Sequence, residues 1–375
     1  MPSNRHWIES LSPWPEEFGL GRMERLLEEL GEPQRAFPAI HIVGTNGKTT
    51  TAGLLEALLD AEGLAVGTYT SPHVLGWEER IRIGTEPVNF EAALGRIRPA
   101  AEAMGATQFE ALTAAALAEF AAAAVEVAVV EAGLGGRLDA TNVLRAPVVV
   151  LTNVALEHTE VLGMEREAIA AEKLAVVSPG AVVVLGEPEW EETARAQGAE
   201  GVVVAGSSNL ALAIAAAETF LGRPVDPHAA EDVIVPGRLE RVGEAPLEIW
   251  DGAHNLAGVG WLLGRLPTAR YVVVASILAD KDADGMLAAL AAVGDVLVAT
   301  QSSNSRALPA EELAQRAARF FDRVEAVPDP ATARTRAHEL AGVEGAVLVS
   351  GSLYLLSDLA AVRLPPVPWR ASASG

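Results

Sequence analysis

Residues 39–60 read AIHIVGTNGKTTTAGLLEALLD, and this stretch decides the fold of the first half of the chain. Its first residues, 40–43, predict the end of a buried strand, and residues 51–59 have the apolar spacing of a helix. A glycine turn between a strand and a helix lets backbone N–H groups approach an anion, and the helix N-terminus adds partial positive charge. The candidate phosphate-binding turn consists of Gly44, Thr45, Asn46, Gly47, Lys48, Thr49 and Thr50.

Within this turn, Lys48 is placed to reach the outer phosphates of a nucleotide, and a hydroxyl of Thr49 or Thr50 to face Mg²⁺. The usual P-loop has a glycine six residues before its lysine, and Ile42 stands at that position here. The strand before the turn and the helix after it nevertheless favour a nucleotide site over a chance Gly-Lys-Thr.

Composition narrows the possible functions. The chain has 375 residues, with 28 Lys and Arg against 50 Asp and Glu, a formal net charge of -22. Nucleic acids and anionic membranes require clustered positive charge, so neither is expected as a partner. There is no cysteine, which excludes disulfides, a thiol nucleophile and cysteine-ligated zinc. The apolar run 111–130 is interrupted by Glu119 and Glu126, so we expect a buried helix running into a strand, no membrane span, and a cytoplasmic protein.

Strands and helices alternate along the chain. This pattern predicts an α/β protein with a P-loop-containing, doubly wound, mostly parallel sheet, followed by a smaller Rossmann-like α/β domain. We place the first domain at residues 1–235 and the second at 236–375, a normal domain size. Within the first, residues 78–83 alternate charged with apolar side chains and predict a half-exposed strand.

Ligands of parallel α/β sheets bind beyond the carboxyl ends of the strands. Ser71, Glu131 and His158 fall there together with Lys48. Glu131, directly after an apolar strand, suits a Mg²⁺ ligand, and the alternatives are a helix cap or a partner of Arg137. His158 on its own is more often a structural histidine, and only its position after the next strand singles it out.

Other polar positions are less specific. Lys173 lies inside a predicted helix, and spacing alone favours a solvated or salt-bridged lysine. Residues 133–136 lack a dinucleotide fingerprint, and we expect a turn that brings backbone near a substrate. In the second domain, Asp251 follows a strand and suits either ribose hydroxyls or a helix cap. Together with the polar loops 279–282 and 302–306, it indicates a binding face.

The motifs taken in order resemble one family, the folylpolyglutamate synthases/dihydrofolate synthases of the Mur ligase superfamily. The resemblance covers about residues 40–360. It is carried by residues 41–48 (HIVGTNGK), 69–73 (YTSPH), 131–143 (EAGLGGRLDATNV), 156–163 (LEHTEVLG), 236–240 (PGRLE), 251–255 (DGAHN) and 351–355 (GSLYL).

The resemblance implies an ATP-dependent ligase. A pteroate or folate carboxylate attacks the γ-phosphate of ATP to give an acyl phosphate, and the amine of L-glutamate then displaces phosphate. Whether the acid is dihydropteroate, a reduced folate or both stays open. The expected partners are these small molecules, and we expect a monomer.

The resemblance also assigns roles to residues. Ser71 and Glu131 would hold one Mg²⁺, and Glu131, His158 and a carbamylated Lys173 would hold or support a second, with room for a monovalent cation. Lys48, His158 and Lys173 would thus be catalytic. The remaining nucleotide contacts would come from Asn209 at the adenine, Arg238 at the phosphates, Asp251 at the ribose, and His254 nearby.

Three alternatives are weighed against this assignment. Thr49-Thr50 replaces the Gly-Ser that is usual in folate enzymes and matches peptidoglycan Mur ligases, which act on UDP-linked precursors. Against that alternative, only about 40 residues precede the loop, too few for a UDP-binding domain. A P-loop NTPase that forms no amide would leave the polar strand ends of the second domain without a role. An NAD-dependent dehydrogenase would need the missing dinucleotide fingerprint.

Overall fold

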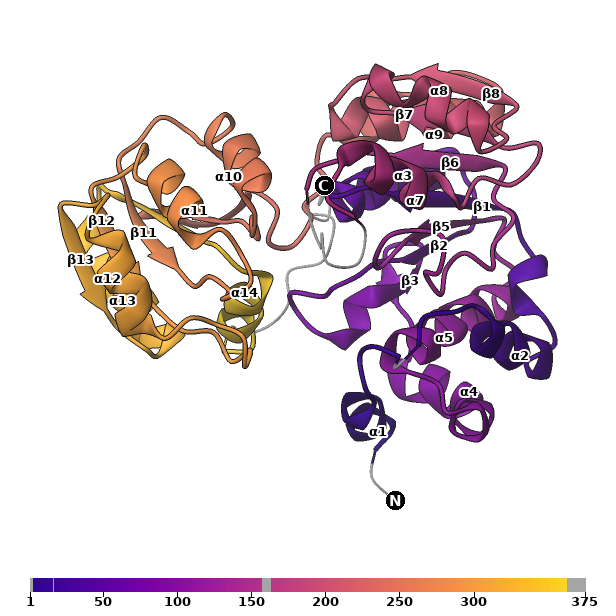
Figure 1. Ribbon diagram of the computed structural model, residues 1–375, viewed down its shortest axis with the longest axis horizontal. Coiled ribbons are helices and arrows are strands. Elements are labelled where there is room, and N and C mark those ends of the chain that lie inside the picture. The colour runs from indigo at the N-terminus through magenta and orange to yellow at the C-terminus, as the bar shows by residue number, and fades with distance from the viewer. Residues whose placement is uncertain (1–2, 16, 157–162, 363–375) are drawn as a thin grey trace, which may run out of the picture. The chain divides into compact units, whose positions relative to one another are not determined.

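The computed structural model describes residues 3–15, 17–156 and 163–362, and the chain forms two compact units (Figure 1). The first unit comprises Met1–Pro72 and Trp77–Val233, and the second comprises His73–Gly76 and Ile234–Gly375. The second unit begins at Ile234, close to the residue 236 expected from the sequence. It also includes four residues from a loop of the first half, which the sequence analysis did not predict.

The described part of the first unit contains an eight-stranded sheet in the order β4-β3-β2-β5-β1-β6-β7-β8. The six strands from β2 to β8 in this order run parallel, whereas β3 and β4 form an antiparallel edge. The strands are β1 (Ala39–Val43), β2 (Val66–Tyr69), β3 (Ile81–Ile83), β4 (Glu86–Pro87), β5 (Val127–Glu131), β6 (Val148–Leu151), β7 (Val182–Leu185) and β8 (Gly201–Val204).

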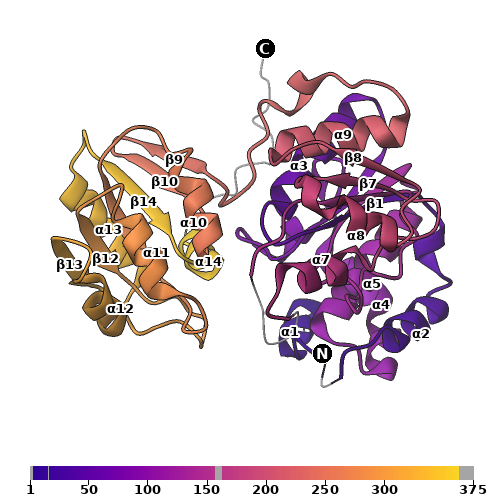
Figure 2. The same cartoon turned by 45° about the horizontal axis from the view of Figure 1, so that its top comes forward.

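Helices cover both faces of this sheet (Figures 1 and 2). One face packs against α3 (Lys48–Ala61) and α9 (Asn209–Leu221), whose apolar side chains join the sheet in one buried cluster. The other face packs in a second cluster against the other helices that the structure describes in this unit. These are α1 (Asn4–Ser10), α2 (Gly21–Glu29), α4 (Phe90–Met104), α5 (Gln108–Ala122), α7 (Arg166–Leu174) and α8 (Glu191–Ala196).

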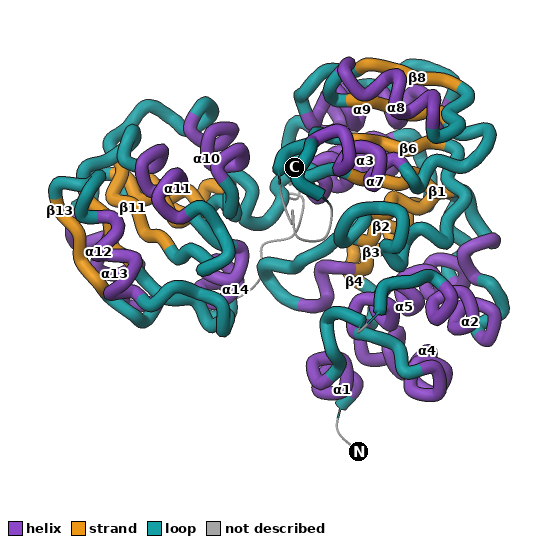
Figure 3. Tube along the Cα trace, in the orientation of Figure 1, coloured by secondary structure: helices purple, strands orange, loops and turns teal. Residues whose placement is uncertain are grey.

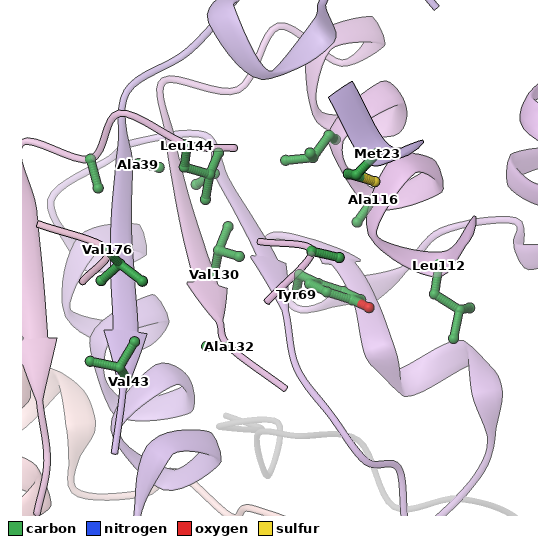
Figure 4. Close-up of a cluster of buried hydrophobic side chains, with 14 of the residues drawn as sticks. Met23, Ala39, Val43, Tyr69, Leu112, Ala116, Val130, Ala132, Leu144 and Val176 are labelled. Carbon is green, nitrogen blue, oxygen red and sulfur yellow. The ribbon is translucent and has the colours of Figure 1, made fainter. Parts of the chain in front are cut away.

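Successive side chains of a strand point to opposite faces of its sheet. In β1, Ile40 and Ile42 belong to the cluster beneath α3 and α9, whereas Ala39 and Val43 belong to the opposite one. Figure 4 shows Ala39 and Val43 on the second of these faces, beside Val130 of β5. His41 lies between them and is fully buried.

The described part of the second unit contains a six-stranded sheet in the order β13-β12-β11-β14-β10-β9, shown as orange strands between purple helices in Figure 3. Helices α10 to α12 share a core with one face. Helices α13 and α14 share another with the opposite face, and this core includes Val74. The edge strand β9 is antiparallel to β10 and was not predicted from the sequence.

The elements of the second unit are β9 (Glu240–Glu244), β10 (Leu247–Trp250), α10 (Leu256–Leu263), β11 (Tyr271–Ala275), α11 (Ala283–Leu290), β12 (Val296–Ala299), α12 (Ala310–Ala317), β13 (Arg323–Ala326), α13 (Pro330–Ala341), β14 (Ala346–Ser350) and α14 (Leu353–Ala360). None of the described helices in either unit is both long and apolar enough to cross a bilayer. The short 3₁₀ helices among the described residues are η1 (Pro33–Arg35), η2 (Trp77–Arg80), η3 (Pro188–Trp190) and η4 (Pro227–Ala230).

The prediction of a half-exposed strand over residues 78–83 is wrong. Residues 77–80 form η2, and only Ile81–Ile83 are extended. Arg82 is fully buried because Glu56 of α3 pairs with its guanidinium and the Glu79 carbonyl accepts from Nη1 at 2.9 Å. A charged residue is buried when it is paired in this way, and an alternating pattern alone does not reveal the partner.

The burial of His41 predicts a pH dependence of stability. Burial lowers the pKa of His41 from 6.5 to about 4. Between these two values the unfolded chain binds a proton that the native chain does not, so stability should fall as the pH is lowered through this range. For one group the loss reaches about 3 kcal/mol. Urea unfolding of the wild type and of His41→Gln between pH 4 and 7 measures it. A difference between the two proteins that does not change with pH would contradict this account.

Candidate active site

The glycines of the phosphate loop are required by close contacts. Gly44, with φ of 147°, leaves no room for a side chain, since a Cβ there would lie 1.9 Å from Thr152 Oγ1. Gly47 has φ of 85° and caps α3, and a Cβ there would lie 2.5 Å from Asn209 Oδ1. Asn209, the first residue of α9, therefore lies directly against the loop, as a contributor to a nucleotide site must.

The loop is held in shape by residues that follow β6, which the sequence analysis missed. The Thr45 N–H donates to the Asn153 carbonyl at 2.9 Å, and the Asn46 N–H donates to Asn153 Oδ1 at 3.0 Å. Thr152 Oγ1 donates to the Asn46 carbonyl at 2.7 Å. The sequence did contain a signal for these contacts, because the polar residues Thr152 and Asn153 directly follow the apolar strand β6, which lies next to β1.

Two lysines converge on the start of the loop. Lys48 Nζ donates to the carbonyls of Gly44 and Thr45 at 3.0 and 3.2 Å. Lys173 Nζ also donates to the Gly44 carbonyl at 3.0 Å, and the residue is only 3 % exposed. Spacing favoured a solvated or salt-bridged lysine, and the burial of Lys173 shows that it is not solvated. Two ammonium groups therefore lie beside the glycine loop.

Glu131 connects the end of β5 to two other segments, one at Thr49 and one at Ser71. Its Oε1 accepts a hydrogen bond from Thr49 Oγ1 at 3.0 Å, and its Oε2 accepts one from the Ser71 N–H at 3.1 Å. Glu131 is 2 % exposed. The alternative partner Arg137 instead pairs with Glu172, with Nε and Oε2 3.0 Å apart. The structure thus brings together Thr49, Ser71 and Glu131, as predicted for the first domain.

These groups fit a divalent cation that is shared with phosphate. A buried carboxylate beside a hydroxyl offers the oxygen ligands that Mg²⁺ prefers, and Mg²⁺ is commonly held by one or two carboxylates plus substrate phosphates. Among the described residues there is no group of three or more His, Asp or Glu side chains placed to hold a metal by itself. His158, another of the predicted ligands, lies outside the described residues.

In the second unit, the predicted nucleotide contacts cluster after β10. Asp251 Oδ2 accepts from the Leu239 N–H at 2.8 Å, and its Oδ1 accepts from the Ala253 N–H at 2.9 Å. Burial raises the pKa of Asp251, and the charge of Arg238 opposes this shift. Asp251 is not the helix cap, because Asn255 caps α10 by accepting from the Gly258 N–H.

The other two predicted residues of this unit lie in the same neighbourhood. Arg238 Nη1 donates to the Gly237 carbonyl at 3.1 Å, and His254 Nδ1 lies 2.8 Å from the Gly252 carbonyl. The Gly252 N–H donates to the Gly237 carbonyl at 2.8 Å, which ties the two segments together.

The first unit also has an open hollow that the sequence analysis did not find. Its lining includes three exposed apolar side chains, those of Trp14, Phe18 and Leu138. Its other lining residues are Pro13, Pro15, Gly19, Thr107, Phe109, Glu110, Leu134, Asp139 and Ala140. Leu134 belongs to the glycine-rich turn, so this turn does reach a candidate binding site.

Comparison with known proteins agrees with this geometry. Residues 42–223 match the Mur ligase middle domain, and residues 237–353 match the Mur ligase glutamate ligase domain. The fold and the phosphate site thus define a Mur ligase. Dihydrofolate synthase/folylpolyglutamate synthase of Mycobacterium tuberculosis is 37% identical over 393 residues, covering 83% of this chain and 81% of the relative. The chain belongs to the dihydrofolate synthase/folylpolyglutamate synthase family.

Solved structures of the family share the fold. A structure of Escherichia coli FolC in complex with DHPP and ADP has a TM-score of 0.87 at 30% identity, covering 96% of this chain and 97% of that one. A Yersinia pestis folylpolyglutamate synthase/dihydrofolate synthase with Mn, AMPPNP and L-glutamate bound has a TM-score of 0.85 at 32% identity, covering 96% and 98%.

The position of Glu131 predicts that it controls metal-dependent nucleotide binding. Glu131→Gln keeps the size of the side chain but removes its charge, so the Mg²⁺ concentration needed for half-maximal nucleotide binding should rise by about 10- to 100-fold. Titration of Mg²⁺ against protein with a fluorescent ATP analogue measures this. The control is Glu126→Gln, whose exposed carboxylate accepts from the Ala65 N–H. Equal Mg²⁺ dependence in the two variants would contradict a metal role for Glu131.

Proposed function

We propose that this protein uses ATP and Mg²⁺ to join L-glutamate to the carboxylate of dihydropteroate or a reduced folate through an acyl phosphate. The observation that carries the proposal is the buried Glu131, bonded to Thr49 of the phosphate loop and to Ser71. The relatives support the same chemistry, since one solved structure contains DHPP and ADP and another contains Mn, AMPPNP and L-glutamate.

In this proposal, the first unit handles the phosphates. The loop amides and α3 N-terminus bind them, and Lys48 contributes a positive charge at the γ-phosphate. Ser71, Thr49 and Glu131 would hold one Mg²⁺, and Glu131, His158 and Lys173 a second. Bound Mg²⁺ supplies charge that stabilises the transferring phosphoryl group. Asn209, at the loop, would contact the adenine.

Lys173 is proposed to be carbamylated. A carbamate retains one N–H on its nitrogen, so the hydrogen bond to the Gly44 carbonyl, now 3.0 Å long, can persist after modification. The added carboxylate replaces a cation by an anion at a site where a hard metal ion would otherwise be repelled. Burial at 3 % exposure would shield the carbamate from water.

The hollow in the first unit is proposed to take the pteridine end of the acid substrate. Trp14, Phe18 and Phe109 are the aromatic side chains among its lining residues, and aromatic side chains suit a flat heterocycle. The hollow belongs to the same unit as the phosphate loop, which agrees with a substrate that reacts with ATP.

L-Glutamate is proposed to bind at the strand ends of the second unit. Ser302, after β12, and Ser350, at the end of β14, are buried, and their hydroxyls have no hydrogen-bond partner among the described residues. Lys281 follows β11, with Nζ 3.4 Å from Asp280 Oδ2. Hydroxyls and an ammonium are the groups that bind a carboxylate.

Further roles follow the same proposal. Arg238, Asp251 and His254 of the second unit are proposed to contact the phosphates, the ribose and the nearby part of the nucleotide. A monovalent cation would assist the phosphate site. We also propose a monomer in the cytoplasm, which suits the absence of cysteine.

The experiment that tests the function is ADP release with ATP, Mg²⁺ and L-glutamate. We expect release with dihydropteroate, with tetrahydrofolate or with both, only when L-glutamate is present, and the pattern decides between the two activities. Release with a UDP-muramyl precursor alone would favour a peptidoglycan ligase. Release that needs neither an acid nor L-glutamate would favour an NTPase.

The activity lost on removal of the proposed carbamate should be partly restored by added carboxylic acids. Lys173→Ala should lose most of its ligase activity, and short carboxylic acids added to the assay should restore part of it by occupying the site of the lost carboxylate. Lys281→Ala is a control, since the same acids should not restore its activity. Wild-type activity in Lys173→Ala without added acid would contradict the carbamate.

A further inference from the structure

His41 is a buried polar residue that the mechanism above does not use. It lies in the middle of β1, three residues before Gly44, and is fully buried. Its Nε2 is 2.8 Å from Thr141 Oγ1, whereas its Nδ1 has no hydrogen-bond partner among the described residues. Most buried polar atoms are hydrogen-bonded, so a half-satisfied imidazole in a sheet calls for an explanation.

Thr141 connects His41 to the wall of the hollow. The Thr141 hydroxyl forms a short hydrogen bond with Asp139 Oδ1, which also accepts from the Thr141 N–H at 3.0 Å. Asp139 Oδ2 accepts from the N–H groups of Gly133 and Leu134 at 3.0 and 2.8 Å. Asp139 and Leu134 both line the hollow. A chain of hydrogen bonds therefore runs from the strand of the phosphate loop to the hollow.

The hydrogen-bond donors around Asp139 determine which atom donates and which accepts at each step from His41 to Asp139. A carboxylate has about four lone-pair positions, and three backbone N–H groups and one hydroxyl point at this one. Since Asp139 accepts from Thr141, the Thr141 oxygen is left to accept from His41. His41 must then carry its proton on Nε2, and the atom without a partner is the unprotonated Nδ1.

The opposite tautomer would be costly at both ends of the chain. With the proton on Nδ1, a buried N–H would lack an acceptor among the apolar side chains of this face, and orphaned N–H groups are rarer than orphaned acceptors. The Thr141 hydroxyl would also have to donate to His41, leaving two oxygens facing each other at Asp139 unless the carboxylate were protonated.

We propose that His41 is a positioning residue for the acid substrate, acting through Thr141 and Asp139 on the Gly133–Leu134 wall of the hollow. The inference rests on the proposed function, because it takes the hollow as the site of that substrate. Gly133 and Leu134 also follow Glu131 by only two and three residues. The same series of hydrogen bonds therefore also holds the segment that directly follows Glu131, the proposed metal ligand.

Steady-state kinetics with matched variants test this role. Glutamine places an amide nitrogen near the position of Nε2, whereas asparagine and leucine do not. His41→Asn and His41→Leu should raise KM for dihydropteroate, or for tetrahydrofolate if that is the acid used, by about tenfold. KM for ATP should stay within about twofold, and His41→Gln should recover most of the loss.

Thr141 should behave as the second member of the same chain. Thr141→Val should raise KM for the acid as His41→Leu does, and Thr141→Ser should not. Both changes break the same series of hydrogen bonds. The double variant His41→Leu/Thr141→Val should therefore have a KM for the acid no higher than that of either single variant. Additive losses, or equal changes in KM for the acid, KM for ATP and kcat, would show a general structural role and overturn the proposal.

A measurement on the wild-type protein keeps the proposal testable if a variant fails to fold. Long-range ¹H–¹⁵N NMR of ¹⁵N-histidine-labelled protein identifies each tautomer. The signals that are missing in His41→Gln, or that shift in Thr141→Val, assign His41. We expect the Nε2–H tautomer at pH 7, and the Nδ1–H tautomer would overturn the proposal. This result does not depend on turnover, so a failure of the ligase assay and a failure of this inference can be told apart.

Discussion

The carboxylate of Glu131 is the constraint on which the phosphate site depends. It bonds to Thr49, 82 residues earlier, and to Ser71, 60 residues earlier. These segments meet because β2, β5 and β1 are adjacent and parallel, so that their carboxyl ends lie at one edge of the sheet. A buried carboxylate is costly without partners. The hydroxyl and the backbone N–H that lower this cost are also the groups suited to a metal–phosphate complex.

The alternation of side chains along the strands separates two tasks within the first unit. Ile40 and Ile42 of β1 pack toward α3, and Glu131 at the end of β5 reaches Thr49 on that helix. His41 lies on the other face with Ala39 and Val43, the face packed by α5, whose Phe109 lines the hollow. At the carboxyl ends of these strands, one face of the sheet thus carries the proposed phosphate site and the other face carries the proposed acid-binding hollow. The segment 131–141 connects the two.

Much of the fold could be predicted because it is local. The apolar strands and the glycine turn at 44–50 are visible in the sequence, and the alternation of strands and helices gives a parallel sheet. The predicted grouping of Lys48, Ser71 and Glu131 follows from the same rule, since strand ends converge. The burial of Lys173 and Arg82 could not be predicted from spacing, because it depends on partners (Gly44 and Glu56) supplied by other elements.

The hollow and its connection to β1 were missed for a related reason. Trp14 and Phe18 lie in a lead-in segment without periodicity, and nothing local shows that it lies beside Asp139. His41 read as one polar residue within a buried strand, and its partner Thr141 is 100 residues away. Long-range pairs of polar side chains of this kind leave no periodic signal in a single sequence.

The most direct test of the metal site is the anomalous scattering of Mn²⁺ in crystals grown with AMPPNP. The account predicts a Mn²⁺ peak at about 2.1 Å from an oxygen of Glu131, with the hydroxyl of Thr49 or Ser71 also bound to the ion. A Mn²⁺ peak elsewhere, with Glu131 bonded only to Thr49 and to the Ser71 N–H, would contradict it.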